Sequence, residues 1–266
     1  MSAKISAPPP WMAALEFRAL GERAQMSAML PLLRRLPTGD GHPVLVLPGF
    51  SASDRSTDPL RNLLRRLDYR TYGWGLGVNV GPTRRILDGL VSKLDQAYQR
   101  RQEPVSIVGW SLGGIYAREL ARARPGVVRQ VITLGSPIQM IEADSSSAQP
   151  MWEAMSRYHS PGFRQEMRDV HRPPLAIPNT SIYSRTDGVV SWQACLVPRT
   201  ATSENVRVFG SHCGLGFNSS AIAVIADRLA QPAGTWSHFS PPWYLRGAFP
   251  PATDLDSERL PASAVA

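Results

Sequence analysis

The stretch Ile107–Leu120 reads IVGWSLGGIYAREL, and it decides the fold class of this chain of 266 residues. An apolar run ends at Gly109, a serine stands between two glycines, and a helical pattern of apolar residues follows at once. A buried strand that leads directly into a helix is typical of a parallel sheet covered by helices. The stretch therefore predicts an α/β fold, with Ser111 at the junction of a strand and a helix.

The same alternation of short apolar runs and amphipathic helical patterns extends from residue 43 to residue 231. The expected strands are Val44–Leu47, Tyr69–Trp74, Val105–Val108, Val128–Leu134, Thr180–Tyr183 and Val206–Phe209. The expected helices are Pro59–Leu67, Pro82–Arg101, Leu112–Arg124 and Ser219–Ala230. Because crossovers between parallel strands are right-handed, this order predicts a doubly wound, mostly parallel sheet of six strands.

Four regions are expected along the chain. Residues 1–41 form an N-terminal helical preface, whose apolar periodicity fits either docking on the domain or contact with a lipid interface. Residues 42–232 form the α/β domain. An insertion at about residues 139–178 is rich in methionine and aromatic residues, and it is expected to form a helical cap over the sheet. Residues 233–266 form a proline-rich C-terminal tail.

The net charge of +8 comes from 27 arginines and two lysines, against 21 acidic residues. The arginines are scattered singly or in pairs, which favours solvated helix faces, and no motif indicates nucleic-acid binding. Weak attraction to an anionic lipid surface remains open. The chain has no run of 18 apolar residues, and its N-terminus lacks the pattern of a secretory signal, so a cytoplasmic location is expected.

Ser111 lies in the segment GWSLG, residues 109–113. In open α/β sheets, functional sites lie beyond the carboxyl ends of the strands, and this segment begins at such an end. A G-x-S-x-G turn from strand to helix is strained and lifts the serine oxygen clear of the backbone, and bulky residues at its glycine positions would clash. Ser111 is therefore a candidate nucleophile. An ordinary tight turn is the alternative.

A serine hydroxyl needs a base within hydrogen-bond reach, and the base needs a carboxylate to orient it. The chain has five histidines: His42, His159, His171, His212 and His238. In this fold the base follows the nucleophile and the acid along the chain. His212 follows the last expected strand and precedes a helix, so it is the candidate base, with a purely structural histidine as the alternative.

The acid must lie between Ser111 and His212. The acidic residues in that interval are Glu119, Glu142, Asp144, Glu153, Glu166, Asp169, Asp187 and Glu204. Only Asp187 directly follows a strand pattern, so it is the candidate acid. The pair Asp187–Gly188 is also a common turn pair, and a structural role is the alternative.

An oxyanion intermediate needs two backbone N–H donors. Leu112, directly after Ser111, is expected to supply one. The loop after the first core strand should supply the other, because Gly49 permits a close approach. Phe50 is the first choice and Ser51 the second, while core packing is the alternative role for Phe50.

These motifs, in this order, resemble those of the α/β-hydrolase superfamily, in its lipase and carboxylesterase branch. The resemblance rests on Pro48-Gly49-Phe50, the turn at 109–113, Asp187 at a strand end, and the Ser211-His212 loop, and it covers about residues 43–231. It implies ester hydrolysis through an acyl-enzyme on Ser111, with no metal or organic cofactor. The chain departs from many relatives in having Pro48 where they have histidine. It also lacks room for their N-terminal hairpin, which implies a minimal six-stranded version.

The expected substrate is a small-molecule or lipid ester with an apolar acyl or aryl group. Trp74, Leu76 and Trp110 are candidates to line its pocket. Two other functions stay open: acyl transfer to an alcohol or amine by the same residues, and a non-catalytic binding protein with this fold. Cys195 and Cys213 lie near the candidate acid and base in the sequence, so either a disulfide bridge or two free thiols are compatible with it.

Overall fold

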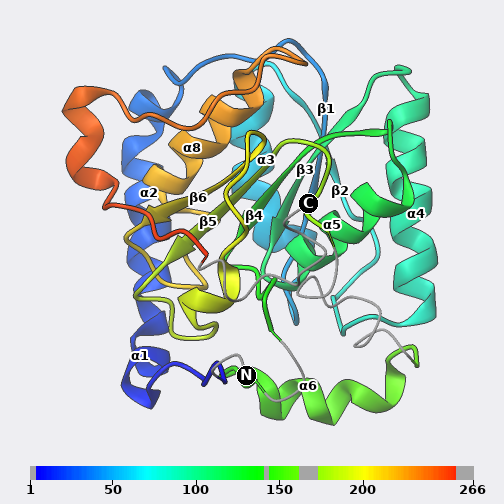
Figure 1. Cartoon of the computed structure of the whole chain (residues 1–266), viewed down its shortest axis with the longest axis vertical. Helices are drawn as coiled ribbons and strands as arrows, with labels where there is room; N and C mark the ends of the chain where they lie inside the picture. Colours follow the sequence, from blue (N-terminus) through cyan, green and yellow to red (C-terminus); the bar gives the residue numbers. More distant parts are fainter. Residues whose placement is uncertain (1–3, 141–143, 162–172, 256–266) are drawn as a thin grey trace.

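A computed structural model describes residues 4–140, 144–161 and 173–255 of the chain. Its six strands form one sheet in the order β2-β1-β3-β4-β5-β6 (Figure 1). All neighbouring strands of this sheet are parallel, so the predicted doubly wound, mostly parallel sheet is confirmed. The strands are β1 Pro43–Leu47, β2 Arg70–Gly73, β3 Val105–Trp110, β4 Val128–Leu134, β5 Asn179–Ser184 and β6 Ser203–Val208.

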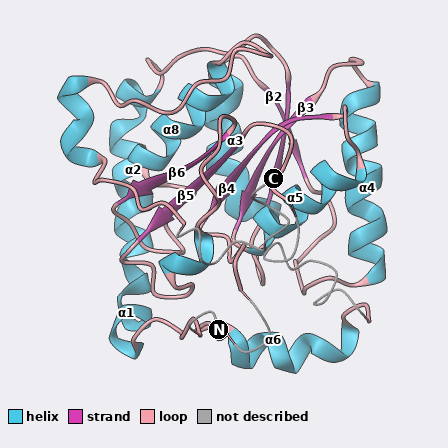
Figure 2. Ribbon diagram, in the orientation of Figure 1, coloured by secondary structure: helices cyan, strands magenta, loops and turns pink. Residues whose placement is uncertain are grey.

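Helices cover both faces of the sheet (Figure 2). The helical elements that precede β4 are α1 Pro10–Ala14, η1 Leu15–Arg18, α2 Ala19–Leu33, α3 Asp54–Arg66, α4 Arg84–Gln99 and α5 Leu112–Ala123. Those after β4 are α6 Gln149–Met155, η2 Ser156–Tyr158, η4 Trp192–Cys195, α8 Ser219–Ala230 and η5 Trp243–Ala248. One apolar core joins α2, α3 and α8 to one sheet face, and a second joins α4 and α5 to the other.

The central strands are buried because both of their faces are covered, and this holds even for β5, most of whose residues are polar. Every residue of β1, β3 and β5 is buried, whereas the edge strand β2 is partly exposed. Continuous burial of this kind is typical of a parallel sheet between two helical layers. It also leaves the loops at the carboxyl edge as the place where polar side chains can gather.

Helix α3 begins at Asp54, five residues before the predicted start at Pro59. The proline lies inside the helix, so reading it as a helix start was wrong. Two features hold the added first turns of the helix in place. The Thr57 side chain is buried, and the Asp54 carboxylate accepts hydrogen bonds from the backbone N–H groups of Trp74 and Gly75 at 2.9 and 2.8 Å.

The N-terminal helices lie along the side of the domain, where α2 packs against α8 (Figure 1). Met26 and Leu33 of α2 are buried in this contact. None of the described helices is long and apolar enough to cross a membrane. Within the predicted cap at about 139–178, the structure describes α6 and η2, while residues 141–143 and 162–172 lie outside the described residues. The tail is described as far as residue 255.

Candidate active site

Ser111 is the single residue between the end of β3 and the start of α5. Its backbone has φ 52° and ψ −121°, a conformation that is strained for a residue with a side chain. The Ser111 N–H donates to the Leu134 carbonyl at 2.8 Å, and the Ser111 carbonyl accepts from Gly114 at 2.9 Å. These two bonds hold the turn, which presents Ser111 half-buried at the carboxyl edge of the sheet.

The glycines beside Ser111 are required by close backbone packing. A Cβ atom at Gly109 would lie 2.4 Å from the carbonyl oxygen of Gly113. A Cβ atom at Gly113 would lie 2.5 Å from the carbonyl oxygen of Leu47, at the end of β1. The turn therefore brings the start of α5 against the loop that follows β1.

Asp187 and His212 are in direct contact. The Nδ1 atom of His212 lies 2.6 Å from Oδ2 of Asp187, and both side chains are buried. The other carboxylate oxygen, Oδ1, accepts hydrogen bonds from the backbone N–H groups of Val189 and Val190 at 2.8 and 2.7 Å. Both oxygens of Asp187 thus have partners, so its side chain is fixed in the orientation that holds the imidazole.

The charge environment of His212 favours its protonated form. Burial alone would lower the pKa of His212, but the Asp187 carboxylate beside it and the nearby Glu16 outweigh burial and raise that pKa above 6.5. An imidazole in this setting can accept a proton and stabilise the resulting positive charge.

Gly135 connects the serine turn to the acid–base pair. It follows Leu134, the partner of the Ser111 N–H, and has φ 56°. A Cβ atom here would lie 3.0 Å from Oδ2 of Asp187 and 3.1 Å from Nδ1 of His212. The backbone at Leu134 and Gly135 therefore contacts both the Ser111 turn and the Asp187–His212 pair.

Trp110 contacts the loop that carries His212. Its Nε1–H donates to the His212 carbonyl at 3.0 Å, and its ring packs edge-on against Phe217. Trp74 is fully buried in the other core and donates to the Gly77 carbonyl. The prediction that Trp74 lines a substrate pocket is therefore wrong, because its side chain is fully buried, while the same role for Trp110 and Leu76 stays a prediction.

In the loop after β1, the backbone N–H of Ser51 already has a hydrogen-bond partner. Ser51 donates its N–H to the Asn79 carbonyl at 2.7 Å. Within residues 4–140, 144–161 and 173–255, neither Phe50 nor Leu112 donates its backbone N–H in a hydrogen bond. The geometry thus favours Phe50 over Ser51 as the partner of Leu112 in binding an oxyanion.

Asn79 holds this loop in place through hydrogen bonds, a role that no local sequence pattern indicates. Its side chain is fully buried and donates to the Pro48 carbonyl at 3.0 Å. Its side-chain oxygen accepts from Gly81 and Tyr116. These contacts join the loop after β1 to α5 and to the loop after β2.

Part of the predicted cap lies against the same loop. The rings of Phe50 and Trp152, on α6, are 5.4 Å apart, and the ring of His159 lies 4.4 Å from that of Trp152. The Nε2 atom of His159 contacts the Val80 carbonyl at 2.9 Å. Helix α6 is thus held beside Phe50 by aromatic packing.

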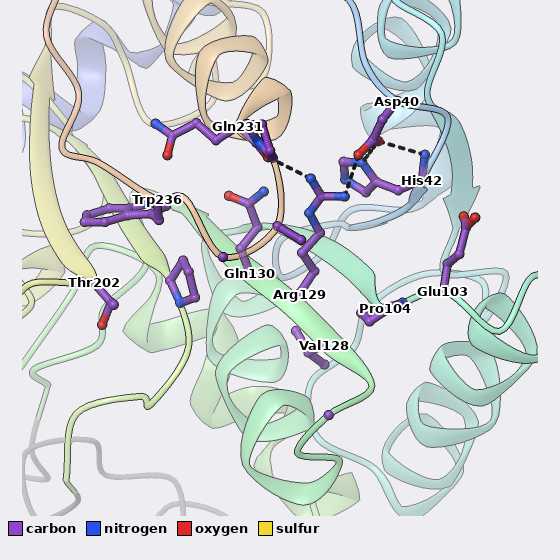
Figure 3. Close-up of a pocket in the computed structure, with 15 residues that line it drawn as sticks. Asp40, His42, Glu103, Pro104, Val128, Arg129, Gln130, Thr202, Gln231 and Trp236 are labelled. Atoms are coloured by element: carbon purple, nitrogen blue, oxygen red, sulfur yellow. Dashed lines mark hydrogen bonds and ion pairs between the residues drawn. The ribbon is translucent and has the colours of Figure 1, made fainter.

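A carboxylate–imidazole–hydroxyl chain lies at the opposite edge of the sheet. His42 contacts Asp40 through Nδ1 and Ser106 Oγ through Nε2, the latter at 2.8 Å. Ser106 is fully buried in β3, so its hydroxyl is closed to substrate. Asp40 and His42 also line a cavity of about 590 Å³ beside Arg129 (Figure 3). None of the lining residues belongs to the candidate catalytic set.

Cys195 and Cys213 are both free thiols, so the disulfide alternative is wrong. Cys195 is buried in a small core with Tyr183 and Val190. Cys213 is exposed on the loop that carries His212. Cys195 thus lies in η4, and Cys213 lies on the loop after β6.

Comparisons with known proteins agree with this architecture. The family model of the PGAP1-like alpha/beta domain matches residues 82–228, which is more than half of the chain. No curated protein sequence matches.

Among solved structures, lipase B from Aspergillus fumigatus has 17% identity and a TM-score of 0.56 over 73% of this chain. The chain spans 54% of that lipase. The lipase BlEst2 from Bacillus licheniformis has 16% identity and a TM-score of 0.55, over 74% of this chain and 95% of its own.

The carboxylesterase EstE1 from a metagenomic library has 14% identity and a TM-score of 0.52, over 80% of this chain and 98% of its own. At these identities the likeness concerns the fold. The chain has the α/β-hydrolase fold, and it belongs to the PGAP1-like alpha/beta domain family.

Proposed function

We propose that the protein is a serine carboxylic-ester hydrolase that acts through an acyl-enzyme on Ser111. The observation that carries the proposal is the 2.6 Å contact between His212 and Asp187, beside the strained turn that presents Ser111. A buried carboxylate that fixes an imidazole at the sheet edge where a half-buried serine lies is the arrangement that acyl transfer by serine requires.

In the proposed cycle, His212 accepts the Ser111 proton as Oγ attacks the ester carbonyl carbon. Asp187 stabilises the imidazolium that forms. The N–H groups of Phe50 and Leu112 stabilise the oxyanion of the tetrahedral intermediate. His212 then gives its proton to the leaving alcohol, and a water molecule, activated by the same imidazole, releases the acid and restores Ser111.

The proposed substrate is an ester with an apolar acyl or aryl group. Phe50 and Trp152 put aromatic surface beside the proposed oxyanion site, and they pack with the second apolar core. An apolar wall at this place would gain free energy by burying a hydrocarbon chain or ring.

We also propose a weak association of the protein with lipid interfaces. The large apolar side chains exposed on the N-terminal helices include Trp11, Phe17 and Leu20, and the net charge is +8. Apolar side chains on a basic surface favour anionic membranes. Cosedimentation with phosphatidylserine-containing vesicles should exceed that with phosphatidylcholine vesicles, and replacement of all three side chains by serine should abolish the difference.

The hydrolase proposal is tested with an active-serine phosphonate and a series of p-nitrophenyl esters of increasing acyl length. We expect stoichiometric labelling of the wild type and turnover of at least one ester. Ser111→Ala should lose both, while Ser106→Ala, which changes the buried serine beside His42, should keep both. Undiminished turnover by Ser111→Ala would rule out the mechanism, and a wild type that is neither labelled nor active would rule out the function.

A further inference from the structure

The N-terminal helices reach both loops that carry the acid and the base. Oε1 of Glu16, in η1, accepts hydrogen bonds from the backbone N–H groups of Gly188 at 2.7 Å and His212 at 3.0 Å. Oε2 accepts from the N–H of Cys213 at 2.8 Å. Gly188 directly follows Asp187, so one carboxylate holds the residue after the acid together with the base itself.

Three further contacts join this segment to the same loops. Arg18 donates to the Thr186 carbonyl at 2.8 Å, and Glu22 accepts from the Ser211 N–H at 2.7 Å. At Gly188 the packing is backbone on backbone, because a Cβ atom there would lie 2.3 Å from the Met12 carbonyl oxygen. The loops are thus held from residues 12 to 22, over a sequence separation of more than 160 residues.

Glu16 is half-buried and is held as a carboxylate. Burial alone would raise its pKa, but the three N–H donors and the charge of His212 lower it below 4.5. Hydrogen bonds from N–H groups to an ionised carboxylate are stronger than those to a neutral acceptor.

The Glu16 carboxylate also acts on His212 through its charge, and together with Asp187 it favours the imidazolium. The titratable and charged groups on this loop and on the elements packed against it include Asp187, Glu16, Glu22, Arg18, Arg23 and Cys213.

We propose that Glu16 is a positioning residue of the active site, which sets the distance and orientation between Asp187 and His212 by binding the backbone of both loops. This inference rests on the proposed hydrolase function. Docking of the N-terminal helices does not require it, because α2 already packs through Met26 and Leu33. A carboxylate bound to three backbone donors of two functional loops acts on their relative position.

Glu16→Gln and Glu16→Asp are the informative variants. The glutamine keeps the size of the side chain but removes the charge and replaces one acceptor oxygen by a donor. The aspartate keeps the charge but is too short to reach all three donors. Glu103→Gln, at an exposed glutamate beside the cavity of Figure 3, is the matched control.

We expect Glu16→Gln to lower kcat about 10- to 100-fold with KM changed less than threefold, since small displacements of catalytic groups have effects of this size. The acid limb of its pH–rate profile should move to lower pH. Glu16→Asp should lower kcat as well but leave the acid limb in place. Glu103→Gln should match the wild type in both respects.

A second readout does not depend on turnover. Titration of His212 in the ¹³C-labelled full chain, followed by NMR, should give a lower pKa in Glu16→Gln than in the wild type. The proposal is overturned if a folded Glu16→Gln protein keeps kcat within twofold of the wild type, or titrates His212 as the wild type does. If the wild type itself has no esterase activity, the hydrolase proposal fails, and an unshifted His212 titration then overturns the role of Glu16 separately.

Discussion

The backbone N–H of Ser51 donates to the carbonyl of Asn79 at 2.7 Å. Ser51 therefore has no N–H available for an oxyanion, and the same bond ties the loop after β1 to the loop after β2. The buried Asn79 side chain adds a second tie, to the Pro48 carbonyl. The position of the neighbouring Phe50 N–H is consequently set by a residue that touches no substrate.

Asn79→Ala should lower kcat about tenfold and leave KM nearly unchanged. Loss of an oxyanion donor costs roughly 10²- to 10³-fold, and a loosened donor should cost less. Steady-state kinetics on a short-chain p-nitrophenyl ester measure this. Asn62→Ala, at an exposed asparagine of α3, is the control and should be neutral. Equal kinetics for the two variants would show that Asn79 has no part in oxyanion binding.

Asp187→Asn should lower kcat by about four orders of magnitude while the protein stays folded. The amide can still accept the N–H groups of Val189 and Val190, but its NH₂ group would hold His212 in the wrong tautomer. Asp40→Asn is a matched control, because Asp40 also contacts a buried histidine. Equal losses in the two variants would contradict the assignment of Asp187, and circular dichroism would establish that both are folded.

The pH dependence of kcat/KM should report the titration of His212. The base must be neutral to accept the Ser111 proton, and the carboxylates of Asp187 and Glu16 raise its pKa above 6.5 despite burial. Activity should therefore fall as the pH is lowered through a midpoint above 6.5. A profile from pH 5 to 9 with a chemically stable ester measures this midpoint. A midpoint near 4 would instead indicate that a carboxylate is the base.

The sequence predicted the features that depend on local pattern. The six strands follow from apolar runs between turn residues, and the candidate site follows from polar residues that come directly after strands. Asp187 and His212 were candidates for this reason, and the structure brings them into contact. The spacing of the glycines likewise predicts a tight turn at Ser111. In the structure, Ser111 has a strained backbone with a φ of 52°.

Other features depend on tertiary contacts and left no local signal. Glu16 is 172 residues from Gly188, and its place in an apolar-periodic helix predicts only an exposed polar position. Asn79 lies in a glycine-rich loop, where a surface turn is the ordinary expectation. Trp74 is a further case, because an aromatic residue after a strand can equally belong to the core, and here its side chain is fully buried.

Trp152→Ala should raise KM about tenfold for long-chain esters and change it little for acetate. Its ring lies against Phe50, so removal would open the apolar wall that the proposed acyl chain contacts. Differences of a few methylene-sized contacts are worth factors of this size. Met151→Ala, at the exposed neighbouring position on α6, is the control. A uniform change across acyl lengths would show that Trp152 supports the fold alone.

Gly135→Ala should lower kcat roughly 10- to 100-fold, because the added methyl group would lie about 3 Å from both Asp187 and His212 and push them apart. Gly126→Ala is the matched control. Gly126 also has a positive φ, of 84°, but a Cβ atom there would have no neighbour within 4 Å.

Both variants should therefore lose about 1–2 kcal/mol of stability through backbone strain. Gly135→Ala should lose more, because its Cβ atom would also lie 2.8 Å from Cδ1 of the buried Leu215, and it alone should lose activity. Thermal unfolding and kcat, measured on the same samples, separate the two effects. If kcat fell in proportion to stability in both variants, contact with the Asp187–His212 pair would have no catalytic consequence. If only Gly135→Ala lost activity, the close approach of the Gly135 backbone to Asp187 and His212 would be necessary for catalysis.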